Sequence, residues 1–348
     1  ALLALLDAGG ASASRRGLLE RHGSARAAVS AGPAAWRDAG LDDAQCQALA
    51  GARPAAATLR WLDTSPDHHL LGWQHPDYPP LLRQIGNPPL AIYVIGAPGR
   101  PWHPAVAAVG ARSPSAGGRE HAQSFSKALA RSGLAIASGL AAGIDTVAHA
   151  TALAEDAITV AVLGTGIDVP YPRANAGLYR RIARTGAIVS EHPPGTGPRR
   201  EHFPSRNRII AGLALGTVVI EAAERSGALI TARLAGESGR EVFAVPGSIH
   251  NPLARGCHRL IREGAGLVES AQEVIAALAP LASELASALR IRLDEAEPGA
   301  PSGGPQTSAD LEPGYQKLWE ALGFDPTGMD QLVSRTGLTA TELSSMLL

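Results

Sequence analysis

Short loops of small residues follow most of the buried apolar runs in this chain. The runs lead into Gly110-Ala111-Arg112-Ser113, Ser138-Gly139-Leu140-Ala141-Ala142-Gly143-Ile144-Asp145, Gly164-Thr165-Gly166-Ile167-Asp168, Ser190-Glu191, Glu221-Ala222 and Pro246-Gly247-Ser248. Small residues let backbone N–H groups approach a ligand closely, and the N-terminus of a following helix attracts an anion. A single such loop is often a plain tight turn. Their succession predicts a crest of anion-binding loops.

Arg112 is the first candidate for phosphate binding at these loops. It stands two residues past the end of an apolar run, and Ser113 follows it directly. A guanidinium binds phosphate oxygens through paired hydrogen bonds, whereas the alternative is a surface arginine without a partner. The candidate nucleic-acid contacts of the crest are Gly110, Arg112, Ser113, Ser138, Gly139 and Gly164.

The densest cationic stretch covers residues 199–208, with four arginines, one acid and one aromatic. It follows a loop rich in Pro and Gly and leads into a predicted helix. That helix N-terminus and its arginines can face phosphates, while the aromatic ring can stack on a base. The alternative is a solvated charged face. The candidate DNA contacts of this stretch are Arg200, Phe203, Arg206, Asn207 and Arg208.

Several nucleotide-binding motifs are absent. Only two of the 31 basic residues are lysines, and neither Lys127 nor Lys317 follows a glycine, which excludes a Walker A motif. The loop from Gly110 does not have the G-x-G-x-x-G pattern, and Val169 stands where the third glycine after Gly164 and Gly166 would fall. We therefore expect neither P-loop hydrolysis nor a dinucleotide cofactor.

Metal and catalytic sites find little support. Asp145 and His149, four residues apart, could be two ligands of a metal ion, but no third ligand lies near them in the sequence. Glu221 and Asp145 are the candidate general bases, although an Asp at a loop–helix junction is more often an N-cap. Cys46 and Cys257 are expected to be inert. We expect no catalytic residue, no metal and no cofactor.

The near-neutral total charge hides a basic middle. The formal net charge is -1, but residues 70–293 carry 22 basic and 16 acidic residues. A polyanion would bind in that middle segment. No apolar run approaches the roughly 20 residues of a membrane span, and no signal pattern opens the chain, so we expect a cytoplasmic protein.

Alternation of apolar runs with helical stretches predicts the fold class. Runs of Val, Ile, Leu and Ala are typical of strands buried on both faces, and helical periods separate them. This pattern predicts an α/β fold with a doubly wound, mostly parallel, Rossmann-like sheet over residues 70–285. The predicted strands are Ala105–Gly110, Leu134–Ser138, Thr159–Gly164, Ala187–Ser190, Thr217–Glu221 and Val242–Val245.

Smaller segments flank the predicted sheet. Residues 1–65 have the pattern of short helices, a small domain of the SAM or helix-hairpin-helix type. Residues 286–314 have the composition of a flexible acidic Pro/Gly linker. Residues 315–348 have predicted helices over 315–322, 329–336 and 339–348 and resemble the start of a winged helix. Thr339 is the predicted cap of the last of these helices, before Glu342. Because the chain starts with Ala and stops before any wing, we expect both ends to be truncated.

Seven motifs, all in order between about residues 70 and 270, resemble the DNA-processing protein A (DprA, or Smf) family. They are Tyr78-Pro-Pro-Leu-Leu-Arg-Gln-Ile-Gly-Asn-Pro-Pro-Leu-Ala-Ile-Tyr93, Val109-Gly-Ala-Arg112, Ser138-Gly-Leu-Ala-Ala-Gly-Ile-Asp145 with Ala148-His149, Phe203-Pro-Ser-Arg-Asn-Arg-Ile209, Glu221-Ala222, Ser226-Gly-Ala-Leu-Ile-Thr-Ala232 and Phe243-Ala-Val-Pro-Gly247.

The resemblance implies a bacterial protein of natural transformation, or competence, that binds incoming single-stranded DNA. It implies a homodimer formed through the Rossmann-like domain and a role in DNA recombination by loading RecA onto the strand. The family's DNA contacts carry over onto Arg112 with its loop and onto Phe203–Arg208. They also carry over onto Arg200, where the family commonly has Lys.

Two other functions fit parts of the sequence. A nucleotide-binding or nucleotide-cleaving enzyme of the related phosphoribohydrolase type carries P-G-G-x-G-T followed by a catalytic Glu. The stretch Ser226–Ala232 lacks both, so this function is the alternative. A regulator that binds duplex DNA would need a basic recognition helix, which residues 331–348 do not provide.

Overall fold

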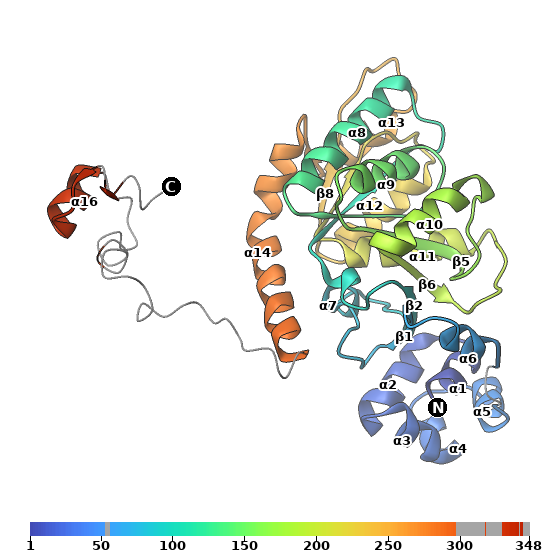
Figure 1. The fold of residues 1–348 in the computed structure, drawn as a ribbon. Coiled ribbons are helices and arrows are strands. Elements are labelled where there is room, and N and C mark those ends of the chain that lie inside the picture. The colour runs from blue at the N-terminus through green and yellow to red at the C-terminus, as the bar shows by residue number, and fades with distance from the viewer. Residues whose placement is uncertain (53–55, 297–316, 318–328, 341, 344–348) are drawn as a thin grey trace. The chain divides into compact units, whose positions relative to one another are not determined.

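The computed structural model describes residues 1–52, 56–296, 317, 329–340 and 342–343. It divides into two compact units, residues 1–290 and residues 291–348. The first unit holds a nine-stranded sheet with helices on both faces and a group of short helices at the N-terminal end (Figure 1). The expected doubly wound, mostly parallel α/β sheet is confirmed.

The strands follow the order β1-β2-β6-β5-β4-β3-β7-β8-β9 across the sheet. They are β1 (His68–Gly72), β2 (Ala91–Ile95), β3 (Ala105–Val109), β4 (Ala135–Ser138), β5 (Thr159–Gly166), β6 (Ala187–His192), β7 (Gly216–Val219), β8 (Glu241–Ala244) and β9 (Gly266–Leu267). Strands β3 to β9 are parallel, and β1 and β2 add an antiparallel edge. The sequence pattern missed β1, β2 and β9 because two of them lie outside the strand–helix alternation and the third has two residues.

Alternate residues of each strand pack on opposite faces of the sheet. Ala107 and Val109 pack with helices α11, α12 and α13, while Val106 and Ala108 pack with α8, α9 and α14. The helices of this region are α7 (Pro80–Arg83), η1 (Arg100–Trp102), α8 (Ala116–Arg131), α9 (Ile144–Ala154), η2 (Arg173–Asn175), α10 (Ala176–Thr185), α11 (His202–Leu213), α12 (Gly227–Glu237), α13 (Arg255–Arg262) and α14 (Ala271–Ala296). The strands are therefore buried on both sides, as their continuous apolar runs predict.

The order of the parallel strands reverses at β3. From β3 the chain adds β4, β5 and β6 on one side and later β7, β8 and β9 on the other. In open α/β sheets, ligands bind beyond the carboxyl ends of the strands at such a switch point. The fold therefore directs attention to the loops that follow β3 and β7.

The N-terminal helices form a small core of their own and are bonded to the sheet region. They are α1 (Leu2–Asp7), α2 (Ser12–His22), α3 (Ala25–Ser30), α4 (Gly32–Asp38), α5 (Asp43–Ala50) and α6 (Ala56–Asp63). Leu18 and Trp36 lie in their core. Arg16 donates to the carbonyl oxygen of Pro88 at 2.8 Å, and Gln74 donates to that of Leu19 at 3.0 Å.

Helix α14 differs from the sequence expectation in two ways. It includes residues 286–296, assigned above to the linker, because its apolar periodicity continues there. Its segment Ala271–Arg292 is also long and apolar enough to cross a membrane by length and composition alone, whereas no such run was expected. A core helix of a globular protein meets the same criterion, and Val274, Leu278 and Leu285 do pack into the sheet core.

The second unit contains α16 (Met329–Thr336), which matches the helix predicted there. After it, the Thr339 hydroxyl donates to Glu342 Oε2 at 2.7 Å, and the Glu342 amide donates to Thr339 Oγ1 at 3.3 Å. This is the capping pair that the sequence predicted. The predicted linker from residue 297 and the predicted helix over 315–322 lie outside the described residues, apart from Lys317.

Candidate nucleic-acid interface

A pocket of about 560 Å³ opens at the switch point of the sheet. We call it the crest pocket. Its lining comes from the loop after β3, the loop before α9, the segment after β5, the start of α11 and the first turns of α12. The lining residues are Val109, Gly110, Arg112, Ala141, Asp145, Tyr171, Arg200, Phe203, Pro204, Arg206, Asn207, Ile210, Ser226, Gly227, Ala228, Ile230 and Thr231. Six of the predicted DNA contacts therefore meet here.

Arg112 projects from a tightly held loop. Its side chain is exposed, and no hydrogen bond or ion pair from it occurs within the described part of the chain. Beside it, the Ile144 amide donates to the carbonyl oxygen of Ala111 at 3.1 Å. Gly143 has a φ of 84°, and a Cβ there would meet the Arg112 backbone, so only glycine fits. The geometry thus leaves Arg112 free to reach a phosphate.

Glu221 fixes the same loop from below. Its carboxylate accepts from the Ser115 amide at 2.9 Å and from the Ser115 hydroxyl at 2.5 Å. It also accepts from the Asn251 side chain at 3.0 Å. Glu221 is buried, and both of its oxygens are engaged. It therefore acts as a tie between the loops after β3, β7 and β8.

Arg206 lines the pocket but is only 7% exposed. Its Nη1 donates to the carbonyl oxygen of Gly139 at 2.8 Å and to that of Val162, and its Nε donates to Asn207 Oδ1 at 3.2 Å. Burial lowers the pKa of Arg206 to about 10, and the nearby Asp145 opposes that effect. Arg206 therefore joins α11 to the loop after β4 and to the middle of β5.

Asp145 holds the loop that Arg206 touches. One carboxylate oxygen accepts from the Gly139 amide at 3.1 Å and from the Ala141 amide at 3.3 Å. Burial raises the pKa of Asp145, while Arg206 and these amides act in the opposite direction. The side chain is committed to the loop before α9. It is not the N-cap that the sequence suggested, because Gly143 occupies that position and α9 has no side-chain cap bond.

Three predicted contacts lie beneath the pocket rather than in its lining. The Ser138 hydroxyl is buried and donates to the carbonyl oxygen of Ala108 at 2.7 Å. A Cβ at Gly139 would lie 2.5 Å from Arg206 Nη2, and one at Gly164 would lie 3.0 Å from the Phe203 ring. The absence of a side chain at Gly139 leaves room for Arg206, and its absence at Gly164 leaves room for Phe203. The DNA contacts predicted for these three residues stay predictions.

Arg200 and Phe203 stand on the α11 side of the pocket. Arg200 is exposed and precedes the helix, whereas Phe203 lies in its first turn. The helix begins at His202, inside the cationic stretch, because Pro204 is tolerated in a first turn where its missing N–H has no intrahelical role. Phe203 is thereby fixed by helical backbone at the mouth of the pocket.

Arg208 and Ser113 do not line the pocket. Arg208 Nη2 lies 2.7 Å from Glu191 Oε1 and 2.8 Å from Oε2, and its Nε donates to the carbonyl oxygen of Asn87 at 2.9 Å. This arginine ties α11 to β6 and to the segment before β2. Ser113 is exposed in the Arg112 loop. Their DNA contacts stay predictions.

Tyr171 and the α12 cap were not among the residues predicted from the sequence. Tyr171 is 43% exposed, and its ring centroid lies 5.3 Å from that of Phe203, with the planes at 41°. Ser226 caps α12 by accepting from the Ala228 amide at 3.3 Å, so the N-terminus of this helix opens on the pocket. Tyr171 lies in the segment after β5, but no local pattern in the sequence distinguishes it as a pocket residue.

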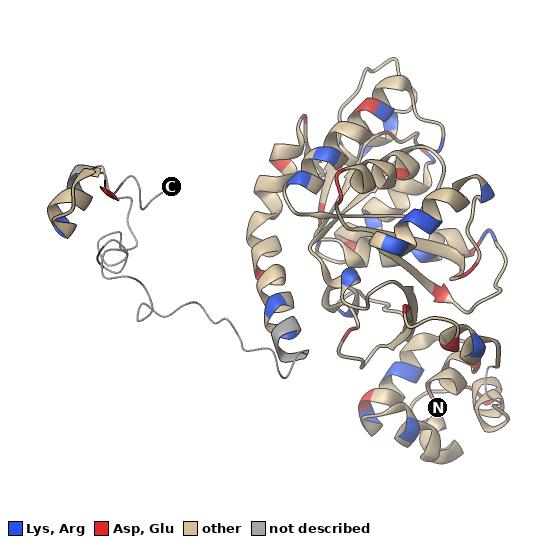
Figure 2. Ribbon diagram, viewed as in Figure 1, with Lys and Arg blue, Asp and Glu red and all other residues tan. Residues whose placement is uncertain are grey.

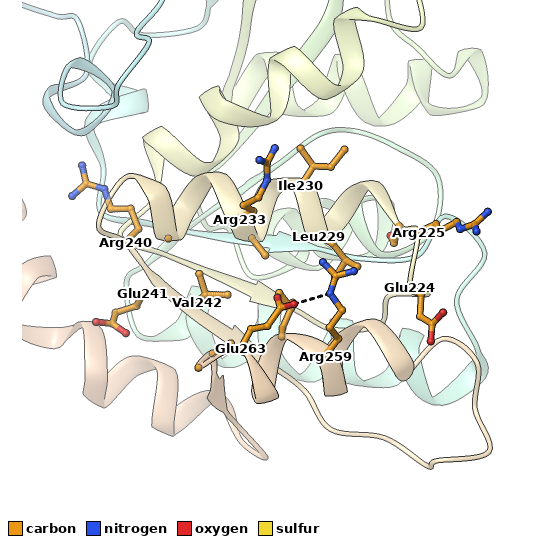
Figure 3. Close-up of a pocket in the computed structure, with 16 residues that line it drawn as sticks. Glu224, Arg225, Leu229, Ile230, Arg233, Arg240, Glu241, Val242, Arg259 and Glu263 are labelled. Atoms are coloured by element: carbon orange, nitrogen blue, oxygen red, sulfur yellow. Dashed lines mark hydrogen bonds and ion pairs between the residues drawn. The ribbon is translucent and has the colours of Figure 1, made fainter.

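A second pocket, the α12–α13 groove, adjoins the first and shares Ser226 and Ile230 with it. Figure 3 shows its charged rim, where Arg259 Nε lies 2.9 Å from Glu263 Oε1. The rim carries the cations Arg225, Arg233, Arg240 and Arg259 and the anions Glu224, Glu241 and Glu263. Figure 2 likewise shows acidic positions among the basic ones in the sheet-containing unit. Mixed charge makes this groove a poorer match to a polyanion than the crest pocket.

Comparison with known proteins decides the family. A sequence model of the DNA recombination-mediator protein A family matches residues 69–279. The chain belongs to this family. A second model, of the DprA winged helix domain, matches residues 302–348, in agreement with the winged-helix-like segment predicted for 315–348.

Relatives and solved structures of DprA agree with the assignment. The chain is 39% identical to Protein Smf of Synechocystis over 78% of this chain and 74% of that protein. It is 48% identical to DNA processing protein DprA of Streptococcus pneumoniae over 57% and 70%. The crystal structure of the pneumococcal DprA matches with a TM-score of 0.65 and 37% identity, over 79% of this chain and 95% of that one.

A second solved DprA structure also matches the chain. DNA processing protein A from Helicobacter pylori, whose structure is described as giving insight into a unique single-stranded DNA binding mode, matches with a TM-score of 0.56 and 27% identity. The match covers 61% of this chain and 96% of that one. Among the residues that the structure describes here, no group of three or more His, Cys, Asp or Glu could hold a metal ion.

Proposed function

We propose that this chain binds single-stranded DNA in the crest pocket, mainly through its phosphates, and loads a RecA-type recombinase onto the bound strand. The observation that carries the proposal is the convergence of two exposed arginines, Arg112 and Arg200, with Phe203 and the N-terminus of α12 around one pocket. Cations and helix N-termini bind phosphates of any sequence. The solved relative described as binding single-stranded DNA supports the choice of ligand.

The proposal places the protein in the bacterial cytoplasm during natural transformation, as a homodimer formed through the Rossmann-like domain. The edge strand β9 supports such pairing, because Leu267 on it is 48% exposed. An exposed apolar edge strand is a favourable surface for a second copy.

We also propose that the pocket binds without catalysing a reaction. The two carboxylates that could serve as general bases are engaged: Glu221 by Ser115 and Asn251, and Asp145 by two backbone amides. A general base must be able to reach a substrate proton. A nucleotide-cleaving enzyme would need Glu221 or Asp145 to break these hydrogen bonds before it could act as a general base.

Fluorescence anisotropy with a labelled oligonucleotide tests the proposal. We expect the wild type to bind the single strand more tightly than the duplex, with affinity that falls as salt rises. Each phosphate that the protein neutralises on a single strand adds about 0.7 to the steepness of log K against log[salt], so Arg112→Ala should lower both affinity and steepness. Arg233→Ala is the matched control, an exposed arginine outside the crest pocket that pairs with Glu237 at 3.3 Å.

Two results would contradict the proposal. Equal binding of duplex and single strand would remove the single-strand assignment, and equal effects of Arg112→Ala and Arg233→Ala would remove the crest pocket as the site. The loading step is tested separately. The protein should accelerate RecA filament formation on strands coated with single-strand-binding protein, and Arg112→Ala should slow that acceleration.

A further inference from the structure

Two aromatic side chains lie at the crest pocket. Phe203 was predicted to stack on a base, whereas Tyr171 has no role in the function proposed so far. Tyr171 and Phe203 come from segments 32 positions apart and line the same pocket. Their planes are tilted by 41°, so the rings touch without covering each other's faces. Within the described residues, this is the one ring contact of the Tyr171 side chain, and its hydroxyl makes no hydrogen bond.

The segment that carries Tyr171 is firmly attached. Asn175 Nδ2 donates to the carbonyl oxygen of Leu140 and to Thr146 Oγ1, both at 2.9 Å. The Tyr179 hydroxyl donates to the carbonyl oxygen of Ile167 at 2.8 Å. These bonds fix both sides of the segment to the loop before α9 and to α10. Tyr171 is therefore an exposed ring on a fixed backbone. The ring belongs to no hydrophobic core cluster, and its hydroxyl makes no hydrogen bond within the described residues.

The surroundings of the pair define the ligand chemistry. Arg112 and Arg200 line the same pocket and are exposed, so cations flank the two rings. Aromatic faces next to cations suit a ligand with flat π-systems joined by phosphates. The pocket volume of about 560 Å³ is in the range of small-molecule sites and can take a base with its sugar and phosphate.

We propose that Tyr171 is a base-stacking residue and that it forms, with Phe203, a two-ring platform for neighbouring bases of one strand. The inference rests on the proposed function and adds to it a contact with the bases. It explains a preference for single strands, because bases in a duplex are already stacked and paired. It also predicts that binding tolerates any sequence, since every base has a π-face.

The test compares variants that remove the ring with one that keeps it. Stacking contributes about 1–3 kcal/mol per base, so Tyr171→Ala should weaken binding of the oligonucleotide roughly 5- to 150-fold. The salt slope should not change, because Tyr171 carries no charge that could neutralise a phosphate. Tyr171→Phe should bind like the wild type. Leu59→Ala is the matched control, because Leu59 is 42% exposed, close to the value for Tyr171, and lies outside the crest pocket.

A spectroscopic readout separates stacking from a general weakening of binding. An oligonucleotide that contains 2-aminopurine should become less fluorescent when it binds the wild type or Tyr171→Phe. At saturating concentration, Tyr171→Ala should quench it less. Circular dichroism should give all variants the same thermal midpoint, because an exposed ring contributes little to the core.

The outcomes distinguish the two proposals. If the wild type does not bind single-stranded DNA, the proposed function fails. If it binds and Tyr171→Ala binds equally well, the platform alone is overturned. If Tyr171→Phe also binds weakly, the loss of affinity comes from the hydroxyl and not from the ring, and the platform is again overturned. Competition by a free mononucleotide as strong as that by the oligonucleotide would make the pocket a nucleotide site instead.

Discussion

Arg206 Nη1 lies 2.8 Å from the carbonyl oxygen of Gly139, and the same nitrogen donates to the carbonyl oxygen of Val162. These carbonyls belong to β5 and the loop after β4, so one side chain of α11 joins two neighbouring strands of the crest. An arginine in the middle of a cationic motif is thereby used to build the site. The exposed arginines of the same pocket, Arg112 and Arg200, are the ones proposed to contact DNA.

Arg206→Ala should lower the free energy of unfolding by about 3 kcal/mol, because it leaves buried carbonyl oxygens without donors and Asp145 without its nearby cation. Urea unfolding measures the decrease. Arg112→Ala is the comparison, and it should stay within about 0.5 kcal/mol of the wild type because its side chain is exposed. Equal stability of the two variants would show that the contacts of Arg206 do not support the fold.

Glu221→Ala should loosen the crest, because the Ser115 and Asn251 donors are then without their shared acceptor. Hydrogen exchange should become faster over residues 110–118 and 246–253, and affinity for single-stranded DNA should fall. The same variant tests the enzymatic alternative. Incubation of the wild type with nucleoside 5′-monophosphates should release no free base; release that Glu221→Ala abolishes would make Glu221 a catalytic residue and reverse our assignment.

Acidification should destabilise the protein through His149. Burial lowers the pKa of His149 to about 3, whereas an unfolded His titrates near 6.5. Between these values the unfolded chain binds the proton and the folded chain does not, so this stability is complete above pH 6.5 and is lost as the pH falls towards 3. At pH 5 the decrease should be about 2 kcal/mol from this group.

Chemical unfolding at pH 7.5 and pH 5 measures that decrease. His149→Gln should be less sensitive to acid than the wild type, whatever its absolute stability. His121→Gln, at an exposed histidine of α8, is the control and should keep the wild-type pH dependence. The same acid sensitivity in both variants would contradict the assignment to His149.

Leu267→Asp should reduce self-association if the open edge at β9 is the dimer surface. A charge at a position that is 48% exposed costs the monomer little but opposes burial against a second copy. Light scattering after size-exclusion chromatography gives the mass. Ile249→Asp is the control, since Ile249 is 76% exposed but lies on the loop after β8 rather than on the edge strand β9. A dimer that survives Leu267→Asp would place the contact elsewhere.

The central sheet could be predicted because its strands have a clear local pattern in the sequence. The run at β3, from Ala105 to Val109, is apolar at every position because both faces are covered by helices. The run at β1 starts His68-His69, is only partly buried, and pairs with an antiparallel partner, so no local pattern marked it. Strand pairing over distance is a property of the fold, which local periodicity does not contain.

The location of the site could be predicted from the sequence, but the role of each residue in it could not. Strand ends and glycines located the pocket, and Arg112, Arg200 and Phe203 line it as expected. The sequence could not tell the buried Arg206 from the exposed Arg200, because burial depends on which loops face each helix. Tyr171 was missed for the same reason: its ring meets Phe203 only when the segment after β5 lies across the start of α11.

The tie made by Glu221 has a consequence for how a strand is taken up. The Glu221 carboxylate already joins the loops after β3, β7 and β8 when no DNA is bound. Little of the protein then has to become ordered when a ligand arrives, so the entropic cost of association falls mainly on the flexible DNA. Such a surface can accept and release strands without a folding step, which suits the proposed transfer of the strand to a recombinase.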